Sequence, residues 1–383
     1  MEARSGSRAR RVRRDVEDFV RSYTAGVKRE DLRRLFERDA SRAYGVLTRD
    51  QPRPEAEQKG LRGGFHRARL LFLGLSYKLT PARRVVFAAS LFCALLGMAD
   101  VEFRVVAGST RVVMDASPAF FLAAIAGLLY LLAVELVDRV LVRDELQVAR
   151  QLQSDLLPRA APPLPGWSIA HSYRTANEVG GDYHCFFPLP DGRLALAIGD
   201  ASGHGMAAGL LMAIANATLQ TAVDIDPAPA RAAALLNRVL CRTGDRRAFM
   251  TLFYAVLDPA TGRLDYVCAG HPFPLLRRAD GAVEELGRGS LPLGMRDPAP
   301  LPIESAALAP GDRLLLYTDG LPEAVGAAGA AFGFDRLASL LAAGGAPQAI
   351  LDRTLEEFTR HLGNEALADD LTVVVLGREP QPA

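Results

Sequence analysis

An α+β fold class is predicted for most of this 383-residue chain, preceded by a helical N-terminal region with a two-helix membrane hairpin. From Trp167 onward, apolar runs of strand length alternate irregularly with amphipathic runs of helix length. The segment Asp258-Pro-Ala-Thr-Gly262 separates two such runs at hairpin spacing, which favours antiparallel pairing. Before residue 160, by contrast, the apolar residues gather in two long uncharged stretches.

The strands are identified by short runs in which successive residues are all apolar, as expected for strands buried on both faces. Strand candidates are residues 168–173, 186–189, 194–198, 249–257, 264–268, 274–277, 313–317 and 372–376. Helix candidates are residues 207–223, 229–241, 335–343 and 346–362.

Residues 1–64 are predicted to be an Arg-rich cytoplasmic region, helical or partly disordered, that ends in a linker. Arginines crowd the first fourteen residues, where they form either a solvated tail or a basic segment attracted to anionic lipid. Residues 15–47 show the apolar spacing of one or two amphipathic helices. Residues 51–64 are polar and rich in charges, Pro and Gly, and are interpreted as the linker.

Residues 65–135 are predicted to hold an amphipathic segment and a transmembrane hairpin, with spans at about 84–104 and 117–137. Both Val85–Ala99 and Pro118–Val134 lack charges, although each is slightly shorter than the ~20 residues that cross a bilayer. A pair of buried core helices is the alternative. Arginines flank both outer ends of the hairpin, so the positive-inside rule places both chain termini in the cytoplasm. The expected location is therefore the cytoplasmic membrane, also called the cell inner membrane.

Residues 136–160 are predicted to form a linker helix between the hairpin and a catalytic domain at 161–378. Apolar residues from Val137 to Leu157 recur at helical spacing, and Pro158 ends the helix. This stripe could pack onto the following domain, or it could be the seam of a parallel homodimer through residues 136–157.

Charge and cysteine content exclude several classes of protein. The formal net charge is +1, which offers no general attraction to nucleic acid, and we expect no nucleic-acid partner. The four cysteines form no Cys-x-x-Cys pair, so they indicate neither a disulfide framework nor a zinc cluster.

Aspartates next to the strand candidates point to a metal centre. Asp182, Asp200 and Asp319 border or follow apolar runs, and the pair Asp369–Asp370 precedes the last run. Taken alone, Asp319-Gly320 also fits an ordinary turn, in which the Asp caps its own backbone and the Gly takes positive φ, and Gly180-Gly181-Asp182 alone is equally unspecific. Several carboxylates at one sheet edge would, however, require a cation, and hard oxygen ligands suit Mg²⁺ or Mn²⁺.

Taken in order, these motifs resemble the SpoIIE/RsbU branch of the PPM (protein phosphatase type 2C-like) family, from about residue 150 to residue 376. The matching phrases are Gln153-Ser-Asp-Leu-Leu-Pro158, Glu178-Val-Gly-Gly-Asp182, Gly199-Asp-Ala-Ser-Gly-His-Gly205, Ala269-Gly-His-Pro272, Leu291-Pro-Leu-Gly294, Pro310-Gly-Asp-Arg-Leu-Leu-Leu-Tyr-Thr-Asp-Gly320, Phe332-Gly333 and Asp369-Asp-Leu-Thr372. The resemblance implies an α-β-β-α sandwich of two antiparallel sheets flanked by helices, with metals at one end between the sheets.

The resemblance also implies two Mn²⁺ or Mg²⁺ ions and a set of ligands. Asp200 matches the carboxylate between the two metals, and the carbonyl of Ala201 matches an additional ligand. Asp319 and Asp369 match the ligands of one metal, and Asp182 matches the carboxylate that holds the second. Asp200 and Asp182 are therefore the expected catalytic residues. The expected supporting residues around these ligands are Asp370, His204, Gly181 and Gly320.

The chain departs from the family pattern at three positions. Ser202 stands where the parent family has a His, and His204 follows two residues later with either a supporting or a capping role. Cys185 replaces an acidic residue three positions after Asp182. The family's phosphate-binding Arg has no secure counterpart, Arg174 being a guess. His271 matches a branch motif for which a structural loop role is expected.

By resemblance, the expected function is a metal-dependent serine/threonine protein phosphatase in bacterial stress or developmental signalling. Its partner would be a phosphorylated anti-anti-sigma (STAS-type) or other regulatory protein. The alternative is a catalytically inactive PPM-like module that binds or scaffolds partners. A cyclic-dinucleotide cyclase is disfavoured, since Gly180-Gly181-Asp182 is followed by Tyr183 rather than by the acidic residue of that signature.

Overall fold

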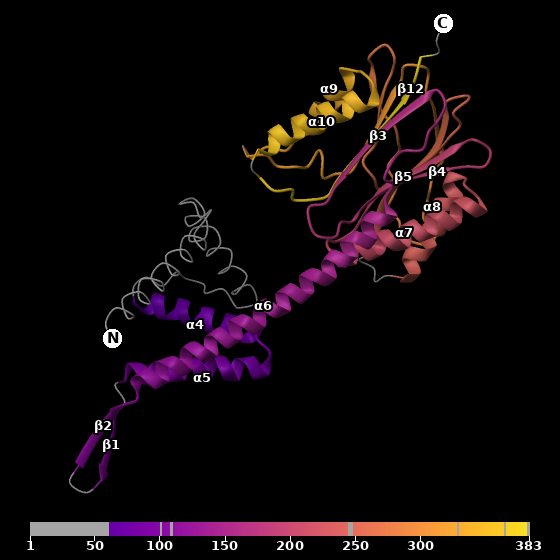
Figure 1. Ribbon diagram of the computed structural model, residues 1–383. Helices are drawn as coiled ribbons and strands as arrows, with labels where there is room; N and C mark the ends of the chain where they lie inside the picture. The colour runs from indigo at the N-terminus through magenta and orange to yellow at the C-terminus, as the bar shows by residue number, and fades with distance from the viewer. Residues whose placement is uncertain are drawn as a thin grey trace, which may run out of the picture. The chain divides into compact units, whose positions relative to one another are not determined.

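The computed structural model of the protein describes residues 61–99, 102–107, 110–243, 248–327, 329–363 and 365–380 (Figure 1). The amphipathic helices expected at 15–47 lie outside these residues. The chain divides into two compact units between Arg139 and Val140, and each has its own architecture.

The first unit consists of helices and one small sheet. Its elements are α4 (Leu61–Lys78), α5 (Pro81–Met98), β1 (Glu102–Ala107), β2 (Thr110–Asp115) and the first part of α6 (Ser117–Leu156). Pro81 occupies the first turn of α5, where its missing N–H has no helical partner to lose. The interpretation of residues 51–64 as a linker was wrong for 61–64, because α4 begins at Leu61.

Helices α5 and α6 have the length and composition of membrane-spanning segments, and α7 (Met206–Ile225) of the second unit does as well. A methyl group on Gly127 of α6 would overlap the hydroxyl of Ser90 in α5, so the backbones approach closely there. Close approach at small residues is typical of helix pairs in membranes. Arg83 of α5 forms an ion pair with Asp138 of α6 at 2.7 Å. Large apolar side chains such as Phe92 and Leu122 are exposed on these helices.

The first predicted span was too long. We expected it to extend to residue 104, but α5 ends at Met98, and Glu102 to Ala107 is a strand paired with β2 in an antiparallel hairpin. Val105 and Val106, with Val112 and Val113 in the paired strand, favour a strand over a helix, because β-branched side chains are restricted in a helix. The loop expected between the two spans is therefore a β-hairpin.

The second unit contains two five-stranded antiparallel sheets. The first sheet, in the order β10-β7-β6-β5-β4, comprises β4 (Asp182–Pro188), β5 (Leu194–Ala201), β6 (Met250–Leu257), β7 (Arg263–Ala269) and β10 (Glu304–Ala307). The second, in the order β3-β12-β11-β8-β9, comprises β3 (Trp167–Arg174), β8 (Leu275–Arg277), β9 (Val283–Glu285), β11 (Arg313–Tyr317) and β12 (Leu371–Arg378).

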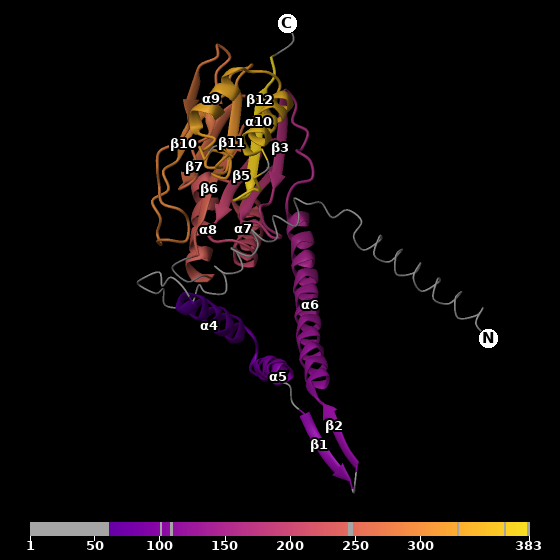
Figure 2. The same cartoon turned by 90° about the vertical axis from the view of Figure 1, so that its left-hand side faces the viewer.

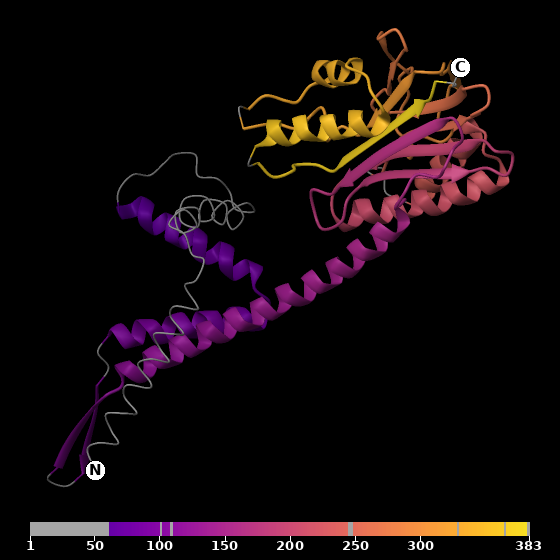
Figure 3. The ribbon, with the colours of Figure 1, turned by 45° about the horizontal axis from the view of Figure 1, so that its top comes forward.

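Helices cover the outer face of each sheet, which makes a four-layer sandwich (Figures 2 and 3). Helix α7 and α8 (Pro229–Thr243) pack on the first sheet, whereas α9 (Phe334–Ala342) and α10 (Pro347–Leu362) pack on the second. In β5, Leu196 faces the core between the sheets, whereas its neighbour Ala197 faces α7 and α8. Both faces of the strand are thus buried, which explains its unbroken apolar sequence.

This architecture confirms the predicted fold class, the α-β-β-α sandwich. It also explains the apolar composition of α7, because about half of the helix is buried in the domain. Strands β9 and β10 were not predicted. Both are short and lie at sheet edges, and β9 ends in Glu284 and Glu285, which are exposed.

The end of α6 belongs to the second unit and runs unbroken to Leu156. Its apolar residues differ in exposure. Leu157, just after the helix, is buried against the α7 side of the domain, whereas Leu152 is 63% exposed. Part of the stripe packs on the domain and part remains exposed.

Candidate metal centre

The aspartates of the separate motifs meet at one end of the sandwich. Asp182 begins β4 and is the pairing partner of Asp200 near the end of β5. In the other sheet, β11 ends at Tyr317 and β12 begins at Leu371, so Asp319 and Asp369 border adjacent antiparallel strand ends. The carboxylates therefore approach from two sheets, in agreement with what the family resemblance implied, rather than from the single sheet edge that the strand-end pattern suggested.

Asp182 is held by the opposite sheet. Its Oδ2 atom accepts hydrogen bonds from the hydroxyls of Thr318 at 2.7 Å and Thr372 at 2.6 Å. Burial raises the pKa of Asp182 well above its ordinary value, and the neighbouring charge of Asp200 raises it further. The two hydroxyls act in the opposite direction and lower it. They leave the other carboxylate oxygen, Oδ1, for an additional partner.

Asp200 is half-buried at the centre of the group. Burial raises its pKa to about 8, and the charges of Asp319 and Asp369 add to the shift. Its backbone N–H donates to the hydroxyl of Thr251 at 3.1 Å, and that hydroxyl also bonds His271 Nδ1 at 3.0 Å. The strand position of Asp200 is thus fixed through its backbone, while its carboxylate remains among like charges.

The adjacent aspartates Asp369 and Asp370 have different environments. Asp370 is buried, and its two oxygens accept backbone hydrogen bonds from Ala176 at 2.8 Å and Gly181 at 2.6 Å. Asp369 is exposed, and its Oδ1 accepts the backbone N–H of Asp370. Asp370 thus joins two loops, whereas the carboxylate of Asp369 keeps an oxygen for a ligand.

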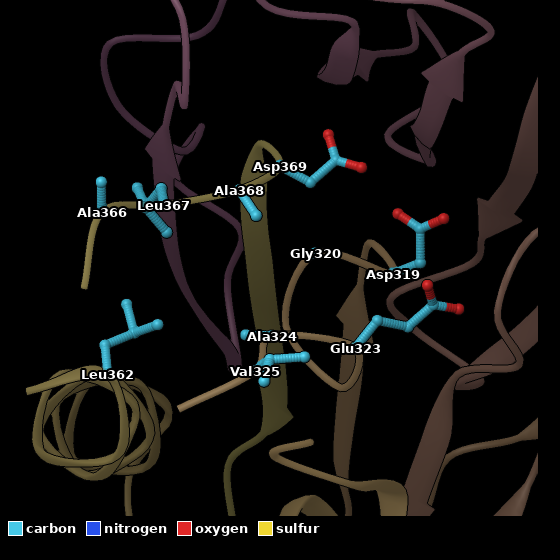
Figure 4. A pocket seen from close by; sticks show the side chains of 10 residues that line it. All are labelled: Asp319, Gly320, Glu323, Ala324, Val325, Leu362, Ala366, Leu367, Ala368 and Asp369. Carbon is cyan, nitrogen blue, oxygen red and sulfur yellow. The ribbon is translucent and has the colours of Figure 1, made fainter. Parts of the chain in front are cut away.

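A pocket of about 210 Å³ lies beside Asp319 and Asp369. Figure 4 shows the carboxylates of both residues and of Glu323 on the same side of this pocket. Burial raises the pKa of Asp319, and the charges of Asp369 and Glu323 contribute. The opposite wall is apolar and includes Val325 and Leu367.

The donor set fits a hard divalent cation. Within the described residues, no Lys or Arg forms an ion pair with any of these carboxylates, yet burial and mutual repulsion raise the pKa values of Asp182, Asp200 and Asp319. A divalent cation would relieve that repulsion. In the same described part, no three His, Cys, Asp or Glu side chains already surround one point. The carboxylates are therefore gathered but not closed around a common centre, as like charges favour.

The other expected supporting residues lie in different surroundings. Gly181 has no room for a side chain, because a methyl group there would lie 2.8 Å from the carbonyl oxygen of Ala201. A methyl group on Gly320 would overlap the carbonyl oxygen of Asp370. His204 is exposed and precedes Gly205 at the start of α7. The two glycines thus permit close packing around the carboxylates, whereas the position of His204 suits a helix start.

Three further positions considered from the sequence have other surroundings. Cys185 packs against the core under α7 and α8, on the face of β4 opposite to Asp182. Arg174 ends β3 and lines a groove with residues of α10, among them Glu356 and Arg360. His271 is buried and supports Thr251 rather than facing the pocket.

Sequence reasoning missed Thr318, Thr372 and Glu323. Thr318 directly precedes Asp319, and Thr372 follows Asp370 by two residues, so both lay within the motifs but were not singled out. Glu323 stands four residues after Asp319, and its backbone N–H donates to the Asp319 carbonyl at 2.9 Å. This spacing of four could have indicated that the turn returns Glu323 to the same site.

Comparison with known proteins supports the family resemblance that the sequence motifs of this domain indicated. Residues 190–379 match the family model described as Stage II sporulation protein E (SpoIIE). The match begins after Asp182, so that residue lies outside it. The chain is 30% identical to Protein IcfG of Synechocystis sp. over 276 residues, which are 65% of this chain and 43% of that protein.

A second relative and two solved structures extend the comparison. Phosphoserine phosphatase RsbP of Bacillus subtilis is 29% identical over 47% of this chain and 45% of its own length. The chain thus spans less than half of these two curated relatives. The RsbU and RsbW domains of Rv1364c from Mycobacterium tuberculosis align with 30% identity and a TM-score of 0.51, over 59% of this chain and 64% of that one.

The SiaA-PP2C domain of Pseudomonas aeruginosa shares the fold, with a TM-score of 0.54 and 23% identity over 62% of this chain and 97% of that one. Its sheets and helices therefore agree with the sandwich described above. The SpoIIE match over residues 190–379, the similarity to RsbP and the carboxylate-bearing strand ends together assign the C-terminal domain of the chain to the SpoIIE/RsbU branch of the PPM family.

Proposed function

We propose that the chain is a metal-dependent serine/threonine protein phosphatase that hydrolyses phosphoserine or phosphothreonine on a regulatory protein. The observation that carries the proposal is the group of carboxylates from two sheets, without a basic partner in the described part of the chain. The similarity to a curated phosphoserine phosphatase supports it.

Two Mn²⁺ or Mg²⁺ ions would be held by these residues. Asp200 would lie between the ions with the carbonyl of Ala201, Asp319 and Asp369 would complete one site, and Asp182 would serve the other. When bound, such ions activate a water molecule and neutralise the charge of the phosphoryl oxygens. Asp182 and Asp200 are the proposed catalytic residues.

The protein's own groups orient this ligand set. Thr318 and Thr372 hold Asp182 in one rotamer through its Oδ2 atom, which preserves the direction of its free oxygen. Asp370 connects the loop before Asp182 to the turn that carries Asp369. Preorganised ligands lose little freedom on binding, so both contacts favour metal affinity.

Phosphate release with and without metal tests the proposal. The full chain in detergent should hydrolyse para-nitrophenyl phosphate or a phosphoserine protein with added Mn²⁺, and should lose this activity in excess EDTA. Undiminished activity in EDTA would refute the metal requirement. No release under any metal condition would favour the inactive binding module instead.

Substitutions of the adjacent aspartates should have different effects. Asp369→Asn should abolish turnover with little change in stability, because the side chain is exposed and is a proposed ligand. Asp370→Asn should reduce turnover less but destabilise the fold, because an amide nitrogen cannot accept one of its two backbone hydrogen bonds. Turnover at saturating Mn²⁺ and urea unfolding measure both effects. The reverse order of turnover would exchange the two assignments.

The proposed substrate is a phosphorylated anti-anti-sigma (STAS-type) partner in bacterial signalling. This choice rests on the family resemblance and on the similarity to RsbP and to the RsbU domain. Faster phosphate release from a phospho-STAS protein than from an unrelated phosphoserine protein would support it. Equal rates with both substrates would argue for another partner.

We further propose that α5 and α6 anchor the chain in the cytoplasmic membrane, with the phosphatase domain in the cytoplasm. The exposed apolar side chains of both helices and the Arg-flanked ends support this arrangement. The chain should remain in the membrane pellet after extraction with alkaline carbonate. Complete release into the supernatant would contradict the proposal.

A second copy of the chain is proposed to pack on the exposed face of α6. Leu141, Val148 and Leu152 are each more than half exposed and are spaced by seven and four residues, as in a dimer seam. Val148→Asp with Leu152→Asp should therefore produce a monomer in sedimentation experiments. Val142→Asp, which changes an exposed residue on another side, should not. A dimer that persists in the double variant would show that this face is not the interface.

A further inference from the structure

The side chain of Gln153, near the C-terminal end of α6, is paired with the backbone of Gly180. The N–H of Gly180 donates to Gln153 Oε1 at 2.9 Å, and Gln153 Nε2 donates to the carbonyl oxygen of the same glycine. Gln153 is 6% exposed. It therefore bonds Gly180 as a neighbouring strand would, with one donor and one acceptor.

Gly180 lies where the carboxylate-bearing segments converge. A methyl group there would lie 2.5 Å from both Asp370 Oδ2 and the hydroxyl of Tyr173, so the backbone touches these groups. The next residue, Gly181, donates its N–H to Asp370 and accepts the N–H of Ala201 at 3.1 Å. The Gly180–Gly181 loop thus contacts the segments of Asp370 and Asp200, and it leads directly into Asp182.

The loop depends on Gln153 for both polar groups of the Gly180 backbone. If the amide were removed, the buried N–H and carbonyl would lose their partners, and leaving buried polar groups unsatisfied is unfavourable. The loop could avoid this cost by moving toward water. Such a movement would also displace the Gly181 N–H from Asp370, because the two residues are adjacent.

We propose that Gln153 is a positioning residue through which the end of α6 sets the affinity of the carboxylate group for divalent cations. It acts by holding the Gly180–Gly181 loop, and hence Asp182 and Asp370, in place. The identity of the ligand, a divalent cation, rests on the proposed function. It assigns to α6 a direct contact with the site, whereas the apolar stripe alone indicated packing or dimer formation.

The test compares Gln153→Leu, which keeps the approximate size but removes both hydrogen bonds, with Gln151→Leu on the exposed side of the same helix. Hydrogen–deuterium exchange of the full chain in detergent and EDTA should become at least tenfold faster in peptides covering residues 176–183 of Gln153→Leu. Peptides from β6 and β11 should be unchanged, as should all peptides of Gln151→Leu.

Binding of Mn²⁺, measured by calorimetry, should weaken about tenfold in Gln153→Leu and remain unchanged in Gln151→Leu. Activity should then recover at high Mn²⁺ with the wild-type KM for substrate. Gln153→Glu retains the acceptor for the Gly180 N–H, and it should exchange at an intermediate rate. This variant also keeps the test informative if Gln153→Leu does not fold.

Wild-type exchange and Mn²⁺ affinity in both Gln153 variants would overturn the inference. Faster exchange throughout the domain would also overturn it, since Gln153 would then support the fold in general. If the acceleration is local but the wild-type chain binds no Mn²⁺, the loop contact stands and the proposed metal-dependent function fails.

Discussion

Replacement of Asp200 by Asn is expected to reduce phosphate release by roughly 10³-fold or more, corresponding to a loss of about 4 kcal/mol of transition-state stabilisation. Asp200 lies among Asp319, Asp369 and Asp370, whose charges raise its pKa together with burial. An amide at this position would remove the central negative charge and weaken the binding of both proposed cations. Asp319→Asn should have an effect of similar size.

The measurement is phosphate release at saturating Mn²⁺, together with circular dichroism to show that the fold is retained. Removal of one like charge should leave the metal-free fold as stable as wild type or more so, because the carboxylates repel each other. Asp224→Asn, an exposed residue of α7, is the matched control and should keep wild-type activity. Activity at the wild-type level in Asp200→Asn would exclude it from the catalytic group.

Gly320→Ala is expected to remove most activity and to destabilise the domain by about 1–3 kcal/mol. The added methyl group would overlap the carbonyl oxygen of Asp370, a backbone atom that cannot rotate away. The turn carrying Asp369 and Asp370 would have to move relative to Asp319. The substitution should therefore damage the ligand geometry and the fold together.

Gly289→Ala provides the control, because no heavy atom lies within 4 Å of the methyl group it would add. The urea midpoint and phosphate release of this variant should match those of wild type. If Gly320→Ala had the same midpoint and activity as Gly289→Ala, the two strand ends would have to be more loosely packed than the structure shows.

Buried strands were the elements most readily predicted from sequence. The strand predicted at residues 313–317 coincides with β11. Every residue of this strand is buried, and all of them except Arg313 are apolar or aromatic, so the run is easily recognised. β4 was placed less well, because its first residues are Asp182, Tyr183 and His184, which do not form an apolar run. The strand begins at Asp182 because hydrogen bonds from the other sheet stabilise this buried carboxylate. Local pattern cannot reveal such a contact.

The roles of some residues around the site were predicted and those of others were not, because some roles depend on contacts between distant segments. The motifs brought forward Asp182, Asp200, Asp319 and Asp369 because their residue types and order resemble a known family. Gln153 stood within a matching phrase but had no evident task. Its partner, Gly180, is 27 residues away, and their contact requires α6 to end beside the loop before β4.

The sequence by itself determined the elements and the chemical character of this protein, because apolar periodicity and hard oxygen ligands are local properties of the chain. It determined two apolar helices suited to a membrane, an α+β domain, and a set of aspartates suited to divalent cations. Only the tertiary structure decided which carboxylates are tied to backbone groups, as Asp370 is, and which remain available, as Asp369 is. That distinction depends on hydrogen-bond partners from distant segments, which meet only when the two sheets pack together.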